Sequence, residues 1–88
     1  MKREMGDKNR ARLVRMEIVI SQERKMRGLT REQLAQRAHV SRSLIDSIES
    51  PHAYAFSVDV LLRIADALNV DAACLMRAAE ELCQRADL

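Results

Sequence analysis

The sequence predicts an all-α protein of five helices, and two observations support this fold class. The 88-residue chain is rich in Ala, Leu, Arg and Glu, which favour helices over strands. It holds only two glycines, one proline and 2% aromatic residues, so the turn signals and side chains typical of β-sheets are scarce. Apolar residues make up 48% of the chain, which indicates one small folded domain rather than a disordered segment.

The first expected helix spans about residues 10–27. It should end at Gly28, which follows a cluster of cations, because cations in a last turn and a glycine after it favour helix termination. We assign residues 1–10 to a flexible basic arm and residues 11–88 to a single domain. The apolar residues of this helix recur at three- and four-residue spacing: Leu13, Met16, Val19 and Ile20.

Four later helices are predicted by one repeated start signal, a small polar capping residue flanked by an apolar pair. The capping residues are Thr30, Ser41, Ser57 and Asp71. One such match is weak evidence, but four at successive helix-length intervals are strong evidence. The expected helices span about residues 31–38, 42–49, 58–68 and 72–86.

The helices at 31–38 and 42–49 form a distinctive pair, because only three residues separate them. A connection this short makes two helices cross steeply instead of lying antiparallel. The second helix of the pair has its large apolar residues on one side and short polar side chains on the other. Such a face suits close approach to another molecule, although a face that is merely solvated has the same polarity.

Charge is distributed unevenly along the chain. Residues 1–42 carry 12 Lys and Arg against 5 Asp and Glu, whereas residues 43–88 carry 3 against 8. The net charge of +2 therefore hides a half at +7 and a half at −5. The positive half should attract polyanions. Combined with the steep helix pair, this charge indicates DNA binding.

The segment GLTREQLAQRAHVSRSLIDSIES, followed by SVDVLLRIADALNVDAACLM, resembles the helix-turn-helix of the Cro and phage-repressor type, the xenobiotic-response-element family. The resemblance covers residues 24–76 and implies a lambda-repressor-like domain, here with an extended C-terminal helix. It places Ala35 where the paired helices cross. It also matches Arg24 and Glu49 to a pair that ties the first helix to the third. His39 stands where the family usually has a glycine in a left-handed turn.

The same resemblance implies which residues face double-stranded DNA. Arg42 is the expected base reader, because its guanidinium can bond O6 and N7 of one guanine together. Arg31 and Ser50 should contact phosphate, while Gln33 and Arg37 are candidates of second rank. The complete predicted set is Arg31, Gln33, Arg37, Ser41, Arg42, Ser43, Asp46, Ser47 and Ser50.

A single module of this size buries little DNA surface, so we expect a homodimer that reads paired half-sites. The helix at 72–86 carries an apolar stripe that could form the dimer interface, or could simply dock on the first helix. The predicted interface residues are Leu75, Ala79, Leu82, Cys83 and Ala86.

The function predicted is that of a small cytoplasmic, sequence-specific transcriptional regulator, a repressor or autoregulator. The alternative is an antitoxin-like or adaptor module that binds a toxin or other regulatory protein, with DNA binding secondary. We expect no enzymatic activity and no cofactor, because no acid, base or nucleophile pattern surrounds a credible pocket. No metal site is expected, since His39 and His52 stand alone. No apolar run approaches the ~20 residues that span a membrane.

Overall fold

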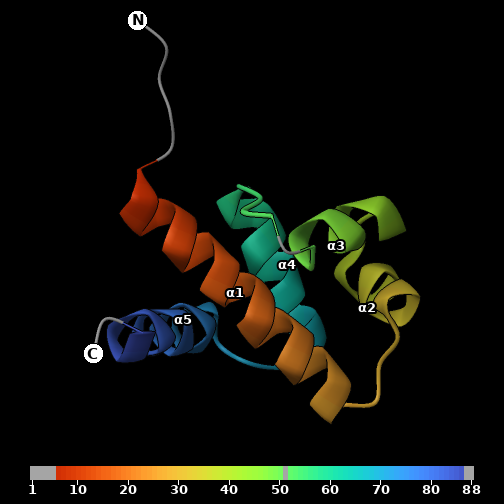
Figure 1. The fold of residues 1–88 in the computed structure, drawn as a ribbon. Helices are drawn as coiled ribbons and strands as arrows, with labels where there is room; N and C mark the ends of the chain where they lie inside the picture. The colour runs from red at the N-terminus through yellow and green to blue at the C-terminus, as the bar shows by residue number, and fades with distance from the viewer. Residues whose placement is uncertain (1–5, 51, 87–88) are drawn as a thin grey trace, which may run out of the picture.

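Five helices run through the part of the chain that the structure, a computed structural model, describes, namely residues 6–50 and 52–86 (Figure 1). The side chains beyond Leu82 lie outside the described set. This architecture confirms the predicted all-α, lambda-repressor-like fold. The helices are α1 (Asp7–Met26), α2 (Arg31–Ala38), α3 (Arg42–Ile48), α4 (Val58–Leu68) and α5 (Ala72–Ala86).

The helices start where the capping signals predict them. The Thr30 hydroxyl accepts a hydrogen bond from the Gln33 amide at 3.0 Å, and the Gln33 side chain accepts one from the Thr30 amide at 2.8 Å, which forms a capping box. Ser41 and Ser57 accept from the third residue of α3 and of α4, at 3.1 Å each. The start of α1 differs from the prediction, because this helix begins at Asp7 and not at about residue 10. A carboxylate in the first turn stabilises a helix through the partial positive charge of its N-terminus. Residues 1–5 of the expected arm lie outside the described residues.

Two helices end in a residue of left-handed conformation that is not glycine. His39 closes α2 with φ 58° and ψ 43°, as its place in the family pattern implies. Asn69 closes α4 with φ 57° and ψ 43°. Asn and His adopt this conformation more readily than most residues, so both ends are built at a moderate cost.

The core lies where all five helices meet, and each helix contributes at least one buried apolar side chain. α5 packs against α1, while α2 and α3 lie across the molecule from α5 (Figure 1). No helix within the described part of the chain has the length and apolar character to span a membrane. The fully buried large side chains are Ile20, Leu34, Ile45, Ile48, Ile64, Leu68 and Leu75.

Candidate nucleic-acid interface

The turn between α2 and α3 sets the direction of α3. After the left-handed His39, the Val40 amide donates to the Ala35 carbonyl at 3.0 Å, which closes the end of α2. Ala35 is buried and α2 packs directly on α3, so its small side chain permits close approach of the two helices. α3 therefore begins directly after this short turn, and it lies at the edge of the molecule (Figure 1).

A buried ion pair fixes the far end of α3 to α1. Arg24 donates through Nε to Glu49 Oε2 at 2.8 Å and through Nη2 to Glu49 Oε1 at 2.9 Å. Its third donor, Nη1, lies 2.7 Å from the Leu29 carbonyl. The two side chains are 10% and 0% exposed, so water screens this pair little. This is the contact between the first and third helices that the family pattern implies.

The candidate face of α3 carries Arg42 at its first position, with Ser41 and Ser43 exposed beside it. Further along, Asp46 and Ser47 are half-buried. Ser50, just past the helix, is half-buried too, and its hydroxyl donates to the Ser47 carbonyl at 2.9 Å. The residues predicted on α3 and at its two ends are thus all exposed or half-buried.

The remaining predicted residues lie on α2. Arg31 is half-buried at its first position, and Arg37 is exposed near its end. Gln33 is exposed, but its side-chain oxygen is already engaged in the capping box. The capping box does not use the side-chain NH2 group of Gln33, which can therefore donate to a ligand.

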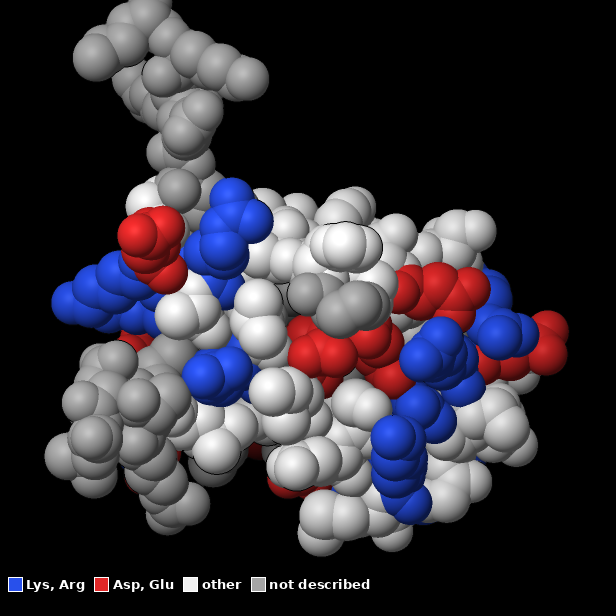
Figure 2. Space-filling view, viewed as in Figure 1, with Lys and Arg blue, Asp and Glu red and all other residues white. Residues whose placement is uncertain are grey.

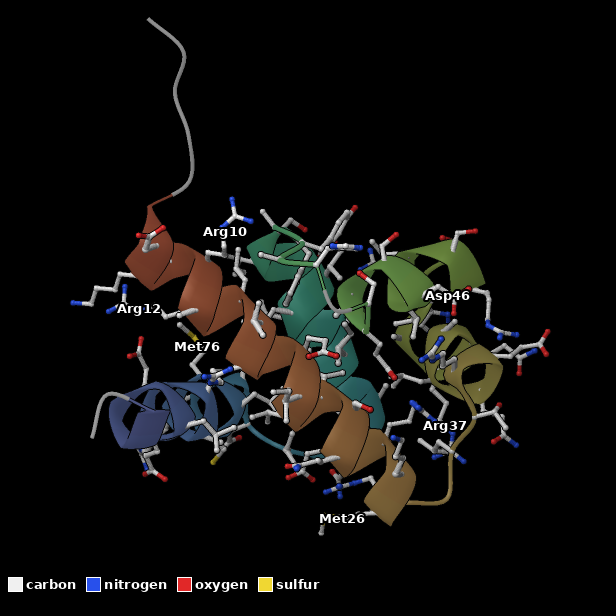
Figure 3. The ribbon with its side chains drawn as sticks, viewed as in Figure 1. Arg10, Arg12, Met26, Arg37, Asp46 and Met76 are labelled. Carbon is white, nitrogen blue, oxygen red and sulfur yellow. The ribbon has the colours of Figure 1, made fainter. Side chains whose placement is uncertain are left out.

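Acidic side chains accompany the arginines of this region. Arg42 donates through Nε to Asp46 Oδ1 at 3.3 Å, and Arg31 Nη1 lies 3.5 Å from the same oxygen. Arg31 Nε is also 3.4 Å from Glu49 Oε1. Figure 2 shows red and blue surfaces interleaved over α2 and α3, and Figure 3 shows Asp46 at the junction of the two helices. The region is therefore electrostatically paired rather than uniformly basic.

The carboxyl group of Glu17, on α1 near Glu49 and Arg31, has a shifted pKa. Burial raises the pKa of Glu17 on α1 above its usual 4.5, and the nearby Glu49 carboxylate raises it further. The cations Arg31 and Lys25 act in the opposite direction but do not cancel these effects. The folded protein therefore binds the Glu17 proton more tightly than the unfolded chain does.

Glu17→Gln is expected to stabilise the protein slightly at pH 7, by about 0.5 kcal/mol or less because the group is partly exposed. Ionised Glu17 lowers stability as pH rises through its raised pKa, and Gln does not ionise. The gain should disappear well below pH 4.5, where Glu17 is protonated in both states. Urea unfolding at pH 7 and again well below pH 4.5 measures this difference in stability. The proteins compared are wild type, Glu17→Gln and the exposed control Glu32→Gln. A gain that is equal at the two pH values contradicts it.

Residues 20–73 match the family model described as helix-turn-helix, and this segment is more than half of the chain. The chain belongs to the helix-turn-helix family of XRE and Cro–λ-repressor type. It is accordingly a helix-turn-helix DNA-binding transcriptional regulator. Among curated proteins, no significant match to the chain was found.

Solved structures of two restriction-modification controller proteins are similar to this helix-turn-helix protein. C.AhdI from Aeromonas hydrophila is 27% identical, with a TM-score of 0.67, and the match covers 72% of this chain and 94% of C.AhdI. Wild-type C.Esp1396I is 23% identical with a TM-score of 0.74, over 84% of this chain and 95% of its own. The likeness to C.Esp1396I, at this low identity, shows a shared fold.

Of the residues predicted for a dimer interface, the structure describes the side chains of Leu75, Ala79 and Leu82. Leu75 and Ala79 are each 2% exposed and belong to the core of a single chain. Leu82 is half-buried and packs against that core, whereas the side chains of Cys83 and Ala86 lie outside the described set. Among the described side chains of α5, the large apolar residue that is exposed is Met76, at 52%. Leu75 and Ala79 of the apolar stripe thus pack within the domain itself.

Met76 borders an apolar groove of about 200 Å³ between α1, α4 and α5. The opposite wall includes Val58, which is exposed at the start of α4. Arg12 and Glu80 flank the groove, with Arg12 Nε 2.8 Å from Glu80 Oε1, an ion pair that lacks hydrogen-bond alignment. Figure 3 shows Arg12 and Met76 on the facing sides of α1 and α5.

Arg63 was missed by the sequence interpretation, although it supports the turn of the helix-turn-helix. It extends from α4 and donates through Nη1 to the His39 carbonyl at 3.3 Å. Its Nε donates to Asp59 at 2.9 Å, one helical turn earlier. The i, i+4 spacing of Asp59 and Arg63 was the available signal. The contact to His39 joins residues 24 positions apart and has no local signal.

Proposed function

We propose that this regulator recognises specific DNA sequences with α3 in the major groove, and that two copies bind paired half-sites as a homodimer. The observation that carries this proposal is the exposed Arg42 at the start of α3, on a helix whose other end is held by the buried Arg24–Glu49 pair. We propose the role of a repressor or autoregulator, and the likeness to C.AhdI, a restriction-modification controller protein, supports a regulatory role.

The polar surface of α3 is suited to base recognition. Ser41 and Ser43 are short, so they let the helix backbone approach the edges of the bases. Arg42 is long enough to reach beyond them, and its terminal nitrogens match O6 and N7 of guanine. A cation held on a rigidly anchored helix meets the same base edge each time the protein docks.

The residues around α3 are suited to phosphate contacts, which set the register on the duplex. Arg31 lies at the first position of α2, beside the unpaired amides of that helix end. Ser50 lies just past the C-terminal end of α3, and Ser47 lies about one helical turn before Ser50. Arg37 and the Gln33 amide provide further exposed donors on α2.

The dimer is proposed for two reasons. A single module buries only about 600–1,000 Å² on DNA, and helix-turn-helix dimers gain specificity from half-sites about one helical turn apart. In addition, the groove at α5 is apolar and bordered by exposed Met76 and Val58. α5 lies across the molecule from α3, so a second copy seated there leaves α3 accessible (Figure 1). In this proposal, Leu75 and Ala79 support the interface helix from within.

Binding of wild type and Arg42→Ala to a library of genomic fragments, measured across salt concentrations, tests the DNA-recognition proposal. Wild type should bind a subset of fragments, with affinity that falls as salt rises because counterions are released. Arg42→Ala should lose about 10- to 100-fold in affinity for those fragments, the value of one bidentate base contact.

The matched control for this experiment is Arg77→Ala, which removes one exposed arginine from α5 instead. It should retain the selectivity of wild type. Salt-independent binding, or an absence of binding by wild type, would overturn the proposal. Equal losses for both arginine variants would show attraction without base recognition.

One observation favours a second candidate function, that of a protein-binding module such as an antitoxin. Asp46 and Glu49 neutralise part of the positive charge of Arg31 and Arg42. A face with paired charges also fits a protein partner, for which phosphate attraction is irrelevant. The salt titration separates the two functions, because only DNA binding requires a steep dependence on salt.

A further inference from the structure

Five charged residues form a continuous chain that runs from the core to the candidate reading face. Buried Glu49 contacts Arg24 on one side and Arg31 on the other, and Arg31 in turn reaches Asp46. Asp46 then accepts a hydrogen bond from Arg42. The side chain of Glu49 is 0% exposed and that of Arg42 is 57% exposed. The exposed arginine is therefore connected, contact by contact, to a buried carboxylate inside the protein.

The contact between Arg42 and Asp46 uses a particular nitrogen. Arg42 donates through Nε at 3.3 Å, and among the described residues no hydrogen bond from its Nη1 or Nη2 is found. The two terminal nitrogens are the ones that can bond end-on to O6 and N7 of guanine. Asp46 thus holds the near edge of the guanidinium and leaves the far edge open to a base.

Holding this side chain has an energetic consequence. A free arginine loses rotamer entropy of up to about 2 kcal/mol when it is ordered. An arginine already held by a carboxylate loses less on binding, and its plane is restricted before the base arrives. The carboxylate also reduces the attraction of this face for phosphate at any sequence. One residue can therefore increase base selectivity and decrease non-specific binding together.

The geometry points to Asp46 as a positioning residue that sets base specificity by orienting Arg42, with Arg31 and Glu49 as its anchor. This inference rests on the proposed DNA recognition by α3. It assigns Asp46 a role through Arg42, not a base of its own. Its removal should therefore affect the same base pair that Arg42 reads.

The test is selection of bound sequences from a random duplex library by wild type, Asp46→Ala, Asp46→Asn and Arg42→Ala. Asp46→Ala should weaken the guanine preference about tenfold, at the base pair where Arg42→Ala abolishes it, corresponding to about 1.4 kcal/mol of discrimination. Binding to unselected DNA should become tighter, because an acidic group is removed. Asp46→Asn keeps an acceptor oxygen and should retain part of the preference.

Glu23→Ala is the matched control, since Glu23 also pairs with an arginine four residues on, Arg27, but on α1. It should leave the selected sequence unchanged. Retention of the full guanine preference by Asp46→Ala overturns the inference, as does loss of preference at a different base pair. If wild type itself selects no sequence, the proposed function fails and this inference fails with it. If wild type selects a sequence and Asp46→Ala selects it equally well, only the inference fails.

Discussion

Glu49→Ala is expected to lower the free energy of unfolding by about 3 to 5 kcal/mol, the usual cost of breaking a buried ion pair on one side. The substitution leaves the Arg24 guanidinium, 10% exposed, with only the Leu29 carbonyl as a partner. It also removes the contact between Glu49 and Arg31. Because small domains are stable by only about 5–15 kcal/mol, the variant should be partly unfolded at moderate temperature.

Urea and thermal unfolding followed by circular dichroism measure this loss. Glu32→Ala, an exposed carboxylate on α2, is the matched control and should change stability by no more than about 0.5 kcal/mol. The double variant Arg24→Met, Glu49→Leu should regain most of the lost stability, since an apolar pair avoids the desolvation cost of two charges. A Glu49→Ala protein as stable as the Glu32→Ala protein would show that the ion pair does not hold α1 to α3.

Met76→Asp is expected to convert the proposed homodimer into a folded monomer and to lower affinity for a paired DNA site by about 100-fold or more. Linking two DNA-binding modules raises their combined affinity by about 10²–10⁴, and a monomer loses this gain. Met76 is half exposed beside the apolar groove, so an aspartate there is hydrated in the monomer but costly to bury in an interface. Monomer stability should therefore change little.

Sedimentation at micromolar concentration, followed by titration with one half-site and with the paired site, measures the effect. Met26→Asp is the matched control, because Met26 is 77% exposed at the far end of α1 (Figure 3). It should remain dimeric and bind as wild type does. A Met76→Asp protein that sediments as a dimer would assign the interface to another surface. Leu75→Asp is unsuitable for this purpose, since Leu75 belongs to the core.

The sequence predicted where the helices of the described chain lie, except that α1 begins at Asp7 and not at about residue 10, because the signals for helix ends are local. Thr30, Ser41 and Ser57 cap helices through amides three residues away, so these contacts can be read along the chain. The family pattern added the left-handed turn at His39 and the pairing of Arg24 with Glu49. The positions of the candidate DNA-binding residues on α2 and α3 follow from these same elements.

By itself, then, the sequence determined the five helices, the helix-turn-helix and the surface that carries Arg42. Only the tertiary structure decided that Leu75 and Ala79 are covered within one chain while Met76 stays exposed, because helical spacing gives an apolar stripe but not what covers it. The tertiary structure also decided that Asp46 contacts Arg31. Packing brings Arg31, fifteen residues away in the chain, to the Asp46 carboxylate, and no local pattern indicates this contact.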